Sequence, residues 1–576
     1  MELSPDVLED AYLKNQLIAY IGNKRRLLGF LAEVFSELES RCTGTKVLSF
    51  GDCFAGSGSV SRLAKMKGFS VASNDWELYS NVINTAHLML SPGELDALFA
   101  AEGGISVVLA ELNNLPQPKE ADCYISRYYA PASTESADYR YERLFYTREN
   151  ALFIDAVRER IEQRYPGWEL SESDYLRKCA LTAPLLYQAA THANTNGVFK
   201  AYHKGFGGHG ADALTRIMAD MQLQLPLTID NLPGRTFNVE SCDAADFAAG
   251  KSFDICYLDP PYNQHQYGSN YFMLNTIAGW DKPEVSMDRS ADGRLEIKAG
   301  IRSDWNNTRS GFCYRKTAPA ELSRLIENID ARFIVLSYNT EGIIPFDELF
   351  EILASYGKTE IFCRDYIIYR GGRQSIGRSN RNVEFQLVLS KGEKAGAGDR
   401  SEIDKLLRVR SIVSIMNESF VPERVKETFS VADSRVELSD GMSELDVRSE
   451  LCYRFLEIPT VTELSSLSAA HLNELLKKLE YCRCRDKHEE SRVLMELIRS
   501  FAADGEAVVY RRLWTSVLKV VRKFAFRKYK DVFEKEFIQL QQLAEDERKL
   551  DRPAVWASID KRIEDLRRVV DLRLNG

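Results

Sequence analysis

The sequence contains no long apolar run. No stretch approaches the roughly 18 consecutive apolar residues that a transmembrane helix needs. The first residues, Met1-Glu-Leu-Ser-Pro-Asp6, also lack the basic and hydrophobic parts of a secretion signal. These absences argue against a membrane or exported protein, and we expect a cytoplasmic protein with no membrane partner.

The sequence also lacks the cysteine spacing of a disulfide-bonded or zinc-binding protein. Its 11 cysteines are scattered and odd in number, which favours reduced, buried thiols. Cys482-Arg-Cys484, with His488 nearby, matches no standard zinc pattern. We therefore expect no metal site.

An excess of positive charge is missing as well. The 84 acidic residues outnumber the 75 basic ones, and the net charge at pH 7 is −9. Because nucleic acids bind proteins largely through phosphate contacts, binding to DNA or RNA would need a local basic surface. With 576 residues, 44% of them apolar, the chain is long enough for two or three domains with ample cores.

The most informative stretch is Asp259-Pro260-Pro261-Tyr262, which closes an apolar run over residues 253–258. That run predicts a buried strand. The prolines fix the backbone and remove two N–H donors, so the loop offers carbonyl acceptors. With the carboxylate of Asp259 and the flat ring of Tyr262, these groups suit a planar base that carries an exocyclic amine. Taken alone, the four residues are also compatible with an ordinary turn after a strand.

A glycine-rich turn follows another apolar strand, near residues 46–52. The turn consists of Asp52, Cys53, Phe54, Ala55, Gly56, Ser57 and Gly58. Glycines let the backbone approach a ligand, and the helix predicted to run to about Lys67 offers unpaired N–H groups at its start. The spacing departs from the three-glycine pattern of dinucleotide-binding folds. A tight turn without a ligand is the alternative interpretation.

An acid ends the next predicted strand. This strand runs from Phe69 to Asn74, and Asp75 follows it in a position to accept hydrogen bonds from ribose hydroxyls. Alternatively, Asp75 caps a helix over residues 77–90. The order of strand, glycine turn, helix, strand and acid favours a ligand site.

These motifs resemble those of the DNA adenine-N6 methyltransferases in the Dam-like, or alpha, order, in which the cofactor half comes first. Tyr20-Ile-Gly-Asn-Lys24 is similar to the family's aromatic-x-Gly-x-Lys motif, and Asp52 to Gly58 is similar to its first cofactor motif. Residues 259–281 resemble the catalytic loop with its following helix, and residues 337–342 resemble a late strand-and-turn motif. The resemblance covers roughly residues 15–390.

The resemblance implies a fold, a cofactor and a set of site residues. The fold would be α/β, the Rossmann-like fold of methyltransferases that depend on S-adenosyl-L-methionine, with an inserted DNA-recognition region and a C-terminal helical domain. The residues implied to bind S-adenosyl-L-methionine are Tyr20, Lys24, Asp52, Phe54, Gly56, Ser57, Gly58, Asp75, Asp243 and Asp259. Among them, Asp243 falls where the family places an acid near the adenine ring of the cofactor. The catalytic residues would be Asp259, Pro260, Pro261 and Tyr262.

The chemistry follows from these residue types. An adenine amine is a weak nucleophile because its lone pair delocalises into the ring. If Asp259 and the carbonyl of Pro260 accept its hydrogens, the nitrogen becomes more tetrahedral, and positioning supplies most of the rate gain. Inside a duplex the amine is out of reach, so the base must be flipped out and stacked on Tyr262, an interaction of about 1–3 kcal/mol. An acid at the first position, where related enzymes carry Ser or Asn, indicates adenine.

We expect a methyltransferase domain over residues 1–390, a linker over 391–400 and a helical accessory domain of unknown role over 401–576. An insertion at about residues 90–235 is too long for a simple connection and is the candidate target-recognition region. The segments that could contact DNA, each also compatible with a solvated loop, are 194–209, 282–316 and 370–381.

The accessory domain contains one basic run, between Tyr510 and Lys530. Lys and Arg alternate there with aromatic residues, and no acid interrupts them. The run is either a surface that contacts phosphates or a helix whose aromatics pack inward while its cations stay solvated.

The sequence thus predicts a site-specific adenine methyltransferase acting on double-stranded DNA, within a restriction-modification or related defence system. Its expected partner is a restriction endonuclease or another protein of that system. Two alternatives remain: an RNA or protein-amine methyltransferase of the same fold, and a non-catalytic nucleic-acid-binding module. The intact loop at residues 259–262, with Lys24, Gly56 and Gly58, argues against loss of catalysis.

Overall fold

The computed structural model describes residues 8–42, 47–208, 211–339, 342–363, 384–394, 399–438, 445–501, 507–525, 529–549 and 553–570. The chain forms two compact units. The first unit contains the described residues up to residue 363 together with Glu384–Asp399, and the second begins at Arg400.

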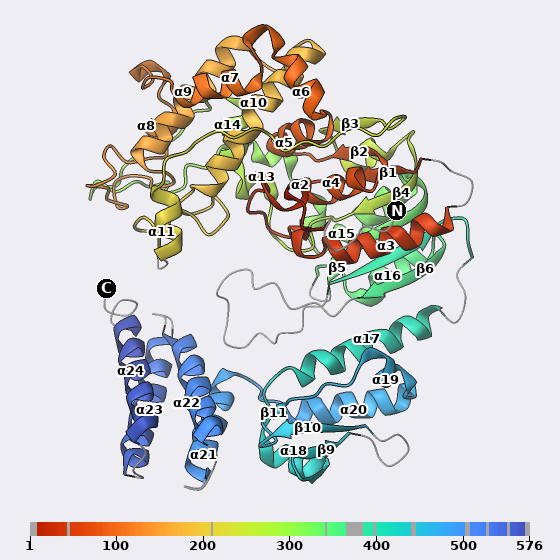
Figure 1. The fold of residues 1–576 in the computed structure, drawn as a ribbon, viewed down its shortest axis with the longest axis vertical. Coiled ribbons are helices and arrows are strands. Elements are labelled where there is room, and N and C mark those ends of the chain that lie inside the picture. The colour runs from red at the N-terminus through yellow and green to blue at the C-terminus, as the bar shows by residue number, and fades with distance from the viewer. Residues whose placement is uncertain are drawn as a thin grey trace. The chain divides into compact units, whose positions relative to one another are not determined.

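The first unit is built on a seven-stranded sheet in the order β3-β2-β1-β4-β5-β7-β6 (Figure 1). Its strands are β1 (Ser49–Asp52), β2 (Ser70–Asn74), β3 (Phe237–Glu240), β4 (Ser252–Leu258), β5 (Asp330–Asn339), β6 (Lys358–Cys363) and β7 (Glu384–Ser390). Neighbouring strands are parallel, except that β7 runs antiparallel to both β5 and β6. The strand order reverses between β1 and β4, where sheets of this kind bind ligands at their carboxyl ends. The predicted Rossmann-like α/β fold is confirmed.

Helices cover both faces of the sheet. They are α3 (Leu28–Arg41), α4 (Ser59–Met66), α5 (Leu78–Leu88), α12 (Ala244–Ala248), α15 (Ala318–Asn328) and α16 (Phe346–Ala354). Leu325 of α15 and Leu349 of α16 share a core with Leu258 of β4. On the opposite face, Phe35 of α3 meets Tyr257 of β4 edge-on, with ring centroids 6.1 Å apart. Successive residues of β4 therefore serve the two faces in turn, as the pleat of a strand requires.

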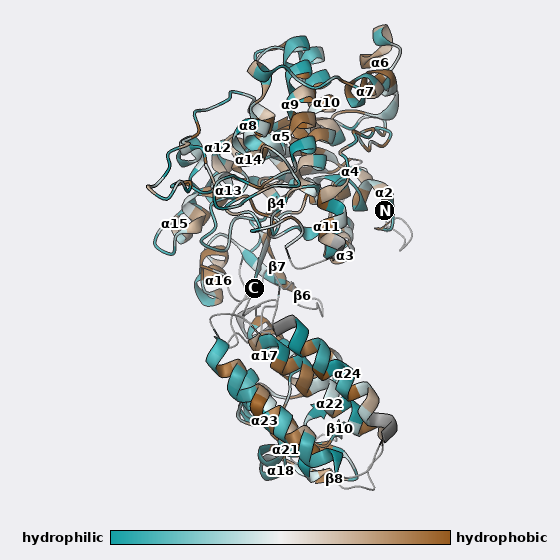
Figure 2. Ribbon diagram, turned by 90° about the vertical axis from the view of Figure 1, so that its left-hand side faces the viewer, coloured by the Kyte–Doolittle hydropathy of each residue, from teal (hydrophilic) through white to brown (hydrophobic). Residues whose placement is uncertain are grey.

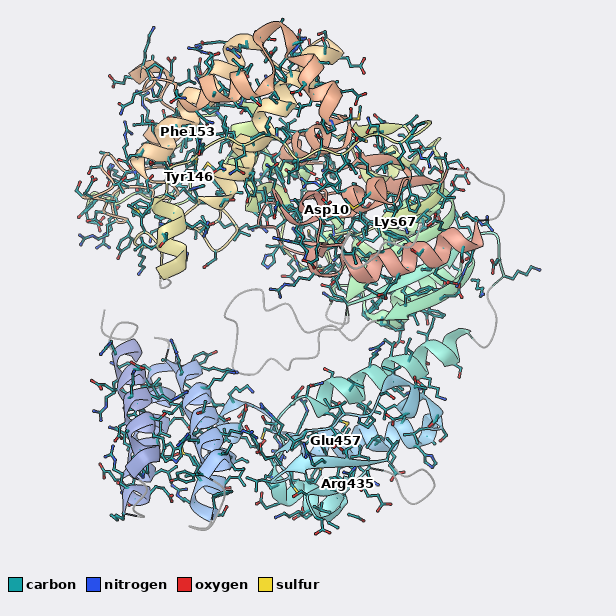
Figure 3. All side chains as sticks on the ribbon, viewed as in Figure 1. Asp10, Lys67, Tyr146, Phe153, Arg435 and Glu457 are labelled. Carbon is teal, nitrogen blue, oxygen red and sulfur yellow. The ribbon has the colours of Figure 1, made fainter. Side chains whose placement is uncertain are left out.

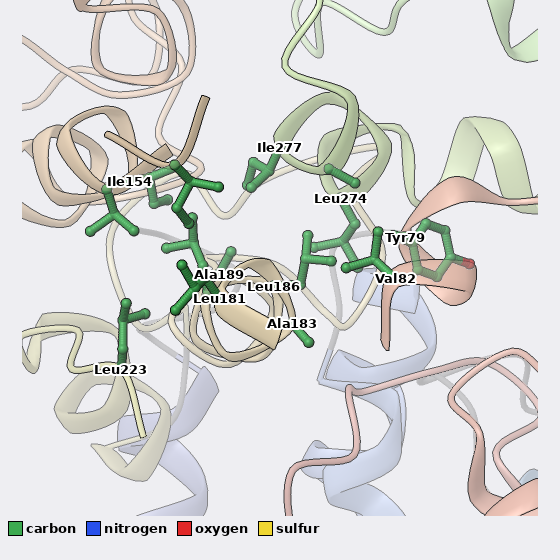
Figure 4. Close-up of a cluster of buried hydrophobic side chains, with 14 of the residues drawn as sticks. Tyr79, Val82, Ile154, Leu181, Ala183, Leu186, Ala189, Leu223, Leu274 and Ile277 are labelled. Carbon is green, nitrogen blue, oxygen red and sulfur yellow. The ribbon is translucent and has the colours of Figure 1, made fainter. Parts of the chain in front are cut away.

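The long insertion folds into a helical lobe that shares a core with the helix after the catalytic loop. Its helices are α6 (Pro92–Leu98), α7 (Ile105–Asn113), α8 (Ile125–Tyr128), α9 (Arg148–Arg164), α10 (Glu172–Thr191) and α11 (Ala211–Met218). In Figure 4, Leu186 of α10 faces side chains of α14 (Phe272–Gly279) and of α5, with which it shares a core. The buried Arg158 of α9 also donates to the carbonyls of Ile277 (2.7 Å) and Ala278 (3.0 Å) at the end of α14. The lobe is thus packed and hydrogen-bonded to the catalytic half of the unit.

Shorter elements complete the first unit. They are α2 (Ala11–Lys14), α13 (Tyr267–Asn270) and the 3-10 turns η1 (Lys24–Arg26), η2 (Ala100–Glu102), η3 (Glu120–Asp122), η4 (Ser303–Thr308) and η5 (Gly311–Cys313).

The second unit is mainly helical, as predicted, but it also contains a small antiparallel sheet that was not predicted. Its helices are α17 (Asp399–Met416), α18 (Pro422–Thr428), α19 (Val461–Ser466), α20 (Ala469–Cys482), α21 (Lys487–Ser500), α22 (Ala507–Val521), η6 (Arg522–Phe524), α23 (Lys530–Arg548) and α24 (Pro553–Val570). The sheet has the order β11-β10-β9-β8, from β8 (Ser430–Ala432), β9 (Arg435–Glu437), β10 (Asp446–Glu450) and β11 (Arg454–Phe455). Arg435 of β9 pairs with Glu457 (3.4 Å), and both are labelled in Figure 3.

The basic run of the second unit lies on amphipathic helices, whose hydrophilic and hydrophobic residues separate to different faces in Figure 2. Tyr510, Trp514 and Phe524 are buried, whereas Arg511 and Lys519 are exposed. The aromatics therefore belong to the core, and the exposed cations are compatible with both interpretations of the run. Residues 526–528 lie outside the described part of the chain.

Among the described helices, none is both long enough and apolar enough to cross a membrane.

Candidate active site

Three acids lie at the carboxyl ends of neighbouring strands. Asp52 ends β1, Asp75 follows β2 and Asp259 follows β4. Because β1 pairs in parallel with both β2 and β4, these three ends meet at one edge of the sheet. The edge brings the glycine turn next to the Asp259–Tyr262 loop, although the two are far apart in the sequence.

The glycine turn is held by the acid of the adjacent strand. The N–H of Gly56 donates to Asp75 Oδ2 (2.8 Å), and the N–H of Glu77 donates to Asp75 Oδ1 (2.9 Å). Gly56 and Gly58 have φ angles of +52° and +79°, a conformation that strongly favours glycine. Glu77, and not Asp75, is the N-cap residue of α5. Asp75 therefore braces the turn, and its contact with a ribose stays a prediction.

Asp52 lies beneath this turn. Its Oδ2 accepts a hydrogen bond from Ser61 Oγ (2.6 Å), and its Oδ1 accepts one from the N–H of Phe54 (3.4 Å). Burial raises the pKa of Asp52 to about 7, against the lowering effect of the hydrogen bond from Ser61. Ser57, also buried, accepts from Asn23 Nδ2 (3.2 Å), which ties the turn to the N-terminal motif.

The N-terminal motif contacts the turn and the catalytic helices through tyrosines. The ring of Tyr20 stacks on Tyr271, with centroids 4.9 Å apart, and lies 5.1 Å from Tyr267. The hydroxyl of Tyr271 accepts from the N–H of Ile21 (2.7 Å). A Cβ atom on Gly56 would come within 2.7 Å of the Tyr20 ring, so this ring lies directly against the turn. The structure thus places the N-terminal motif between the glycine turn and the helices that follow the catalytic loop.

Lys24 connects this motif to the catalytic loop. Its buried ammonium lies 3.0 Å from Asp259 Oδ1 and 3.7 Å from Oε2 of Glu384, the first residue of β7. It also donates to the hydroxyl of Tyr262 (3.5 Å). The sequence analysis assigned Lys24 to the cofactor, and the structure in addition pairs it with the predicted catalytic carboxylate.

Glu384 was missed by the sequence analysis. The only signal was an acid directly before a mainly apolar run over residues 385–389. The side chains of Asp259 and Glu384 are 16% and 18% exposed, against 3% for Lys24. Two carboxylates therefore share one buried ammonium in this site.

Burial and charge shift the pKa values of this cluster. Burial raises the pKa of Asp259 to about 6, although the Lys24 ammonium acts to lower it, and Glu384 adds to the rise. Burial alone would lower the pKa of Lys24, but Asp259, Tyr262 and Glu384 together raise it well above its usual value. Above about pH 6, Asp259 is therefore an ionised acceptor beside a charged lysine.

Two buried acceptors of the cluster have room for a donor. Among the described residues, the Lys24 ammonium is the partner of Asp259 Oδ1 (3.0 Å) and of Glu384 Oε2 (3.7 Å), and neither oxygen has a further donor. Because a carboxylate oxygen can accept two hydrogen bonds, each of these oxygens keeps a lone pair for a bound ligand beside its ion pair. Asp259 Oδ1 fits a ligand that carries an N–H group.

Tyr262 is half-buried and packs edge-on against Tyr338 (5.6 Å between centroids). Its carbonyl accepts from the N–H of Ile343 (3.1 Å), so the loop is held by the segment after β5. Its stacking on a base, and the roles of Pro260 and Pro261, stay predictions.

Asp243 lies beyond β3, at the same edge of the sheet. It caps α12 by accepting from the N–H of Ala245 (3.0 Å) and pairs with Arg324 (3.0 Å). Asn74 and Cys242 exchange hydrogen bonds that hold this loop beside β2. The carboxylate thus has protein partners already, and its proximity to a cofactor ring stays a prediction.

Two of the three candidate DNA-contacting segments touch the catalytic region. The N–H of Phe199, in segment 194–209, donates to the carbonyl of Asn270 in α13 (2.7 Å). In segment 282–316, Ser310 and Gln266 exchange two hydrogen bonds, of 2.9 Å and 3.0 Å. Segment 370–381 lies outside the described residues.

Several arginines of segment 282–316 are engaged in ion pairs within the protein. Arg302 pairs with Asp304 (2.6 Å) and also donates to Asp281 (3.1 Å). Arg315 pairs with Glu348 (2.6 Å). These guanidinium groups stabilise the segment and are less available to phosphates than the sequence alone indicated. In segment 194–209, by contrast, Lys200 next to Phe199 is exposed to solvent.

In the part of the chain that the structure describes, no group of three or more His, Cys, Asp or Glu side chains could hold a metal ion. Cys482 and Cys484 are buried, and His488 pairs with Glu536 instead.

The chain belongs to the D12 class N6 adenine-specific DNA methyltransferase family, whose model matches residues 20–352. It is 30% identical over 369 residues to the Type II methyltransferase M.NlaIII of Neisseria lactamica, covering 64% of this chain and 97% of that protein. It is 29% identical over 373 residues to M.CviAII of Paramecium bursaria Chlorella virus 1, covering 65% and 98%. The modification methylase LlaI of Lactococcus lactis subsp. lactis is 28% identical over 375 residues, covering 65% of this chain but only 54% of LlaI.

The family match confirms the predicted class, an adenine-specific DNA methyltransferase. It ends within α16, so the second unit lies outside it.

Proposed function

We propose that this chain transfers a methyl group from S-adenosyl-L-methionine to N6 of an adenine that is flipped out of duplex DNA. The observation that carries the proposal is the buried carboxylate of Asp259 at the carboxyl end of β4, whose Oδ1 pairs with Lys24 and keeps a lone pair for a further donor. The ordered motifs around it and the family match support adenine as the base.

The residues present fit the methyl donor. The glycine turn allows close approach of a ligand, with Gly56 and Gly58 in conformations that side chains disfavour. Asp75 accepts hydrogen bonds from the N–H groups of Gly56 and Glu77 and would offer its remaining lone pairs to the ribose of the donor. The turn, Tyr20 and Asp243 would hold the nucleoside and amino-acid parts of the donor. When bound, S-adenosyl-L-methionine supplies an electrophilic methyl group on its sulfonium.

The side chains of the catalytic loop would prepare the amine. Asp259 accepts one N6 hydrogen, and the carbonyl of Pro260 accepts the other, so that the nitrogen lone pair is directed at the methyl carbon. Bound S-adenosyl-L-methionine would supply the methyl group to N6 and leave as S-adenosyl-L-homocysteine, and the proton that N6 loses would pass to solvent. Tyr262 stacks on the base and holds it at the distance that attack requires.

The insertion lobe is the part that we propose to read the DNA. Segment 194–209 contacts α13 directly through Phe199 and carries the exposed Lys200 next to that residue. Because the lobe shares a core with α14, binding of DNA at the lobe would affect the position of this helix beside the active site. We further propose that the enzyme is the modification half of a restriction-modification system, because its relatives include Type II modification methylases. The partner would be a restriction endonuclease.

The test is methyl transfer from tritiated S-adenosyl-L-methionine to duplex DNA, RNA and protein in parallel. Label in duplex DNA, recovered as N6-methyladenine after digestion, is the expected result. Label only in RNA or protein would favour another methyltransferase of the same fold, and no label in any substrate would favour a binding module. Sequencing of methylated bases in an expressing host would then identify the recognition site.

A further inference from the structure

The shared lysine raises the question of what the second carboxylate does. Glu384 comes from β7, which enters the sheet antiparallel to its neighbours, so its first residue reaches the same edge as the end of β5. There Asn339, the last residue of β5, is the register partner of Glu384. This reversal places Glu384 beside Lys24 and Tyr262.

The Lys24 ammonium lies closer to one carboxylate than to the other. Asp259 Oδ1 is the nearer carboxylate atom at 3.0 Å, and Glu384 Oε2 lies at 3.7 Å. Tyr262 bridges the two sides, because its hydroxyl lies 3.5 Å from Lys24 and donates to Glu384 Oε1 at 3.5 Å. Glu384 therefore contacts both groups that orient the catalytic loop.

The charge of the cluster of Lys24, Asp259 and Glu384 acts on the nitrogen that receives the methyl group. One ammonium and two carboxylates leave the ionised cluster with a net charge of about −1, in a largely buried site. With Asp259 alone, Lys24 would neutralise the carboxylate that has to accept the amine hydrogen. With Glu384 present, a net negative charge faces the nitrogen, which becomes positive as the N–C bond forms. Preorganised charge of this kind acts mainly on the transition state.

We propose that Glu384 is a positioning residue of the methyl transfer, which holds Lys24 and the Tyr262 hydroxyl so that Asp259 keeps its acceptor strength; this inference rests on the proposed function. Glu384 does not touch the amine in this account. It acts through the two residues that it contacts.

Other charged and titratable groups also face Asp259. Lys24 comes from η1 and Tyr262 from the loop itself; Tyr257 of β4, Tyr267 of α13 and Asp52 of β1 also interact with its carboxylate. Lys24 stabilises the ionised form of Asp259, whereas Glu384 and burial of the carboxyl both oppose its ionisation. Removal of the Glu384 charge is thus expected to make Asp259 easier to ionise.

The central variant is Glu384→Gln, which keeps the size of the side chain and removes its charge. We expect kcat to fall about tenfold with little change in KM for the methyl donor, because the charge acts on the transition state. We also expect the acid limb of the pH profile of kcat/KM to move down by about half a unit or more, because a like charge near Asp259 is gone. A merely structural role would lower activity without moving that limb.

Two further variants make the comparison specific. Glu360 lies on the edge strand β6, where its carboxylate pairs with Arg41 of α3 (2.7 Å) and with Lys358 (3.7 Å). Glu360→Gln removes this charge away from the active site and should leave the pH profile of kcat/KM unchanged. Glu384→Asp keeps the charge on a shorter side chain, so the acid limb should stay at its wild-type pH. This variant also serves if Glu384→Gln does not fold.

An unchanged kcat in Glu384→Gln, or a lower kcat with an unmoved acid limb, would overturn the inference. A shift of the limb in Glu384→Asp equal to that in Glu384→Gln would overturn it as well. Titration of the Asp259 carboxyl by NMR needs no turnover. It therefore distinguishes failure of the role inferred for Glu384 from failure of the proposed function. An inactive wild type would refute the proposed function, whereas an Asp259 titration that is identical in wild type and Glu384→Gln would refute the role of Glu384.

Discussion

Replacement of Asp259 by alanine should separate chemistry from folding and from binding of the methyl donor. The change removes the acceptor of the amine hydrogen and the nearest partner of Lys24. Loss of one oriented electrostatic group of this kind typically lowers kcat about 10²–10³-fold, and we expect at least that loss here.

The cost to stability should be modest, because Lys24 keeps other partners. A buried ion pair that loses one member usually costs about 3–5 kcal/mol, since the remaining charge is left unpaired. In this site Glu384 remains at 3.7 Å and the Tyr262 hydroxyl at 3.5 Å, so we expect about 2 kcal/mol or less. The variant should therefore fold and bind the methyl donor.

The assay compares single-turnover methylation with calorimetric binding of S-adenosyl-L-methionine in the absence of DNA. Asp246→Ala, which removes an exposed acid of α12, is a suitable control and should behave like the wild type. Near-normal turnover by Asp259→Ala on cognate DNA would refute the reasoning. So would a loss of donor binding as large as the loss of turnover, because the residue would then act on the cofactor alone.

Three other outcomes are expected. Gly56→Val should weaken binding of the methyl donor more than it lowers kcat, because a side chain at this position would displace the Tyr20 ring. A donor affinity equal to that of the wild type, measured by calorimetry, would contradict this. Methylation should be lost as the pH falls through about 6, since Asp259 must be ionised to accept a hydrogen and its pKa is raised; a rate profile that is flat from pH 5 to pH 8 would disagree. If the second unit contacts phosphates, glutamine at its exposed cations should flatten the dependence of DNA affinity on salt, by nearly one log–log unit per contact, whereas an unchanged slope in a folded variant indicates a structural role. The cations to replace are Arg511, Lys519 and Arg522.

Much of the first unit could be predicted because its signals are local. The buried run at residues 253–258 became β4 at Ser252–Leu258, and the helix predicted at 77–90 became α5 at Leu78–Leu88. Continuous apolar runs and glycine turns depend on neighbouring residues, which the sequence displays directly. The glycine turn and the catalytic loop lie at one edge of the sheet because the strands before them pair in parallel.

The parts that were not predicted depend on contacts between distant residues. Glu384 gains its position from the reversed strand β7, and nothing beside it in the sequence indicates Lys24 as a neighbour. The arginine pairs of segment 282–316, such as Arg315 with Glu348, were equally invisible in the sequence. In the second unit, strands of only two to five residues, β8 to β11, carry too short a pattern to stand out from loops.

The most direct test of the central claim is mass spectrometry of duplex DNA that the purified protein has methylated with S-adenosyl-L-methionine. After digestion to nucleosides, the account predicts N6-methyladenine as the methylated product, formed by the wild type and at least about 10²-fold more slowly by Asp259→Ala. DNA that contains only methylcytosine, or no methylated base, would contradict it.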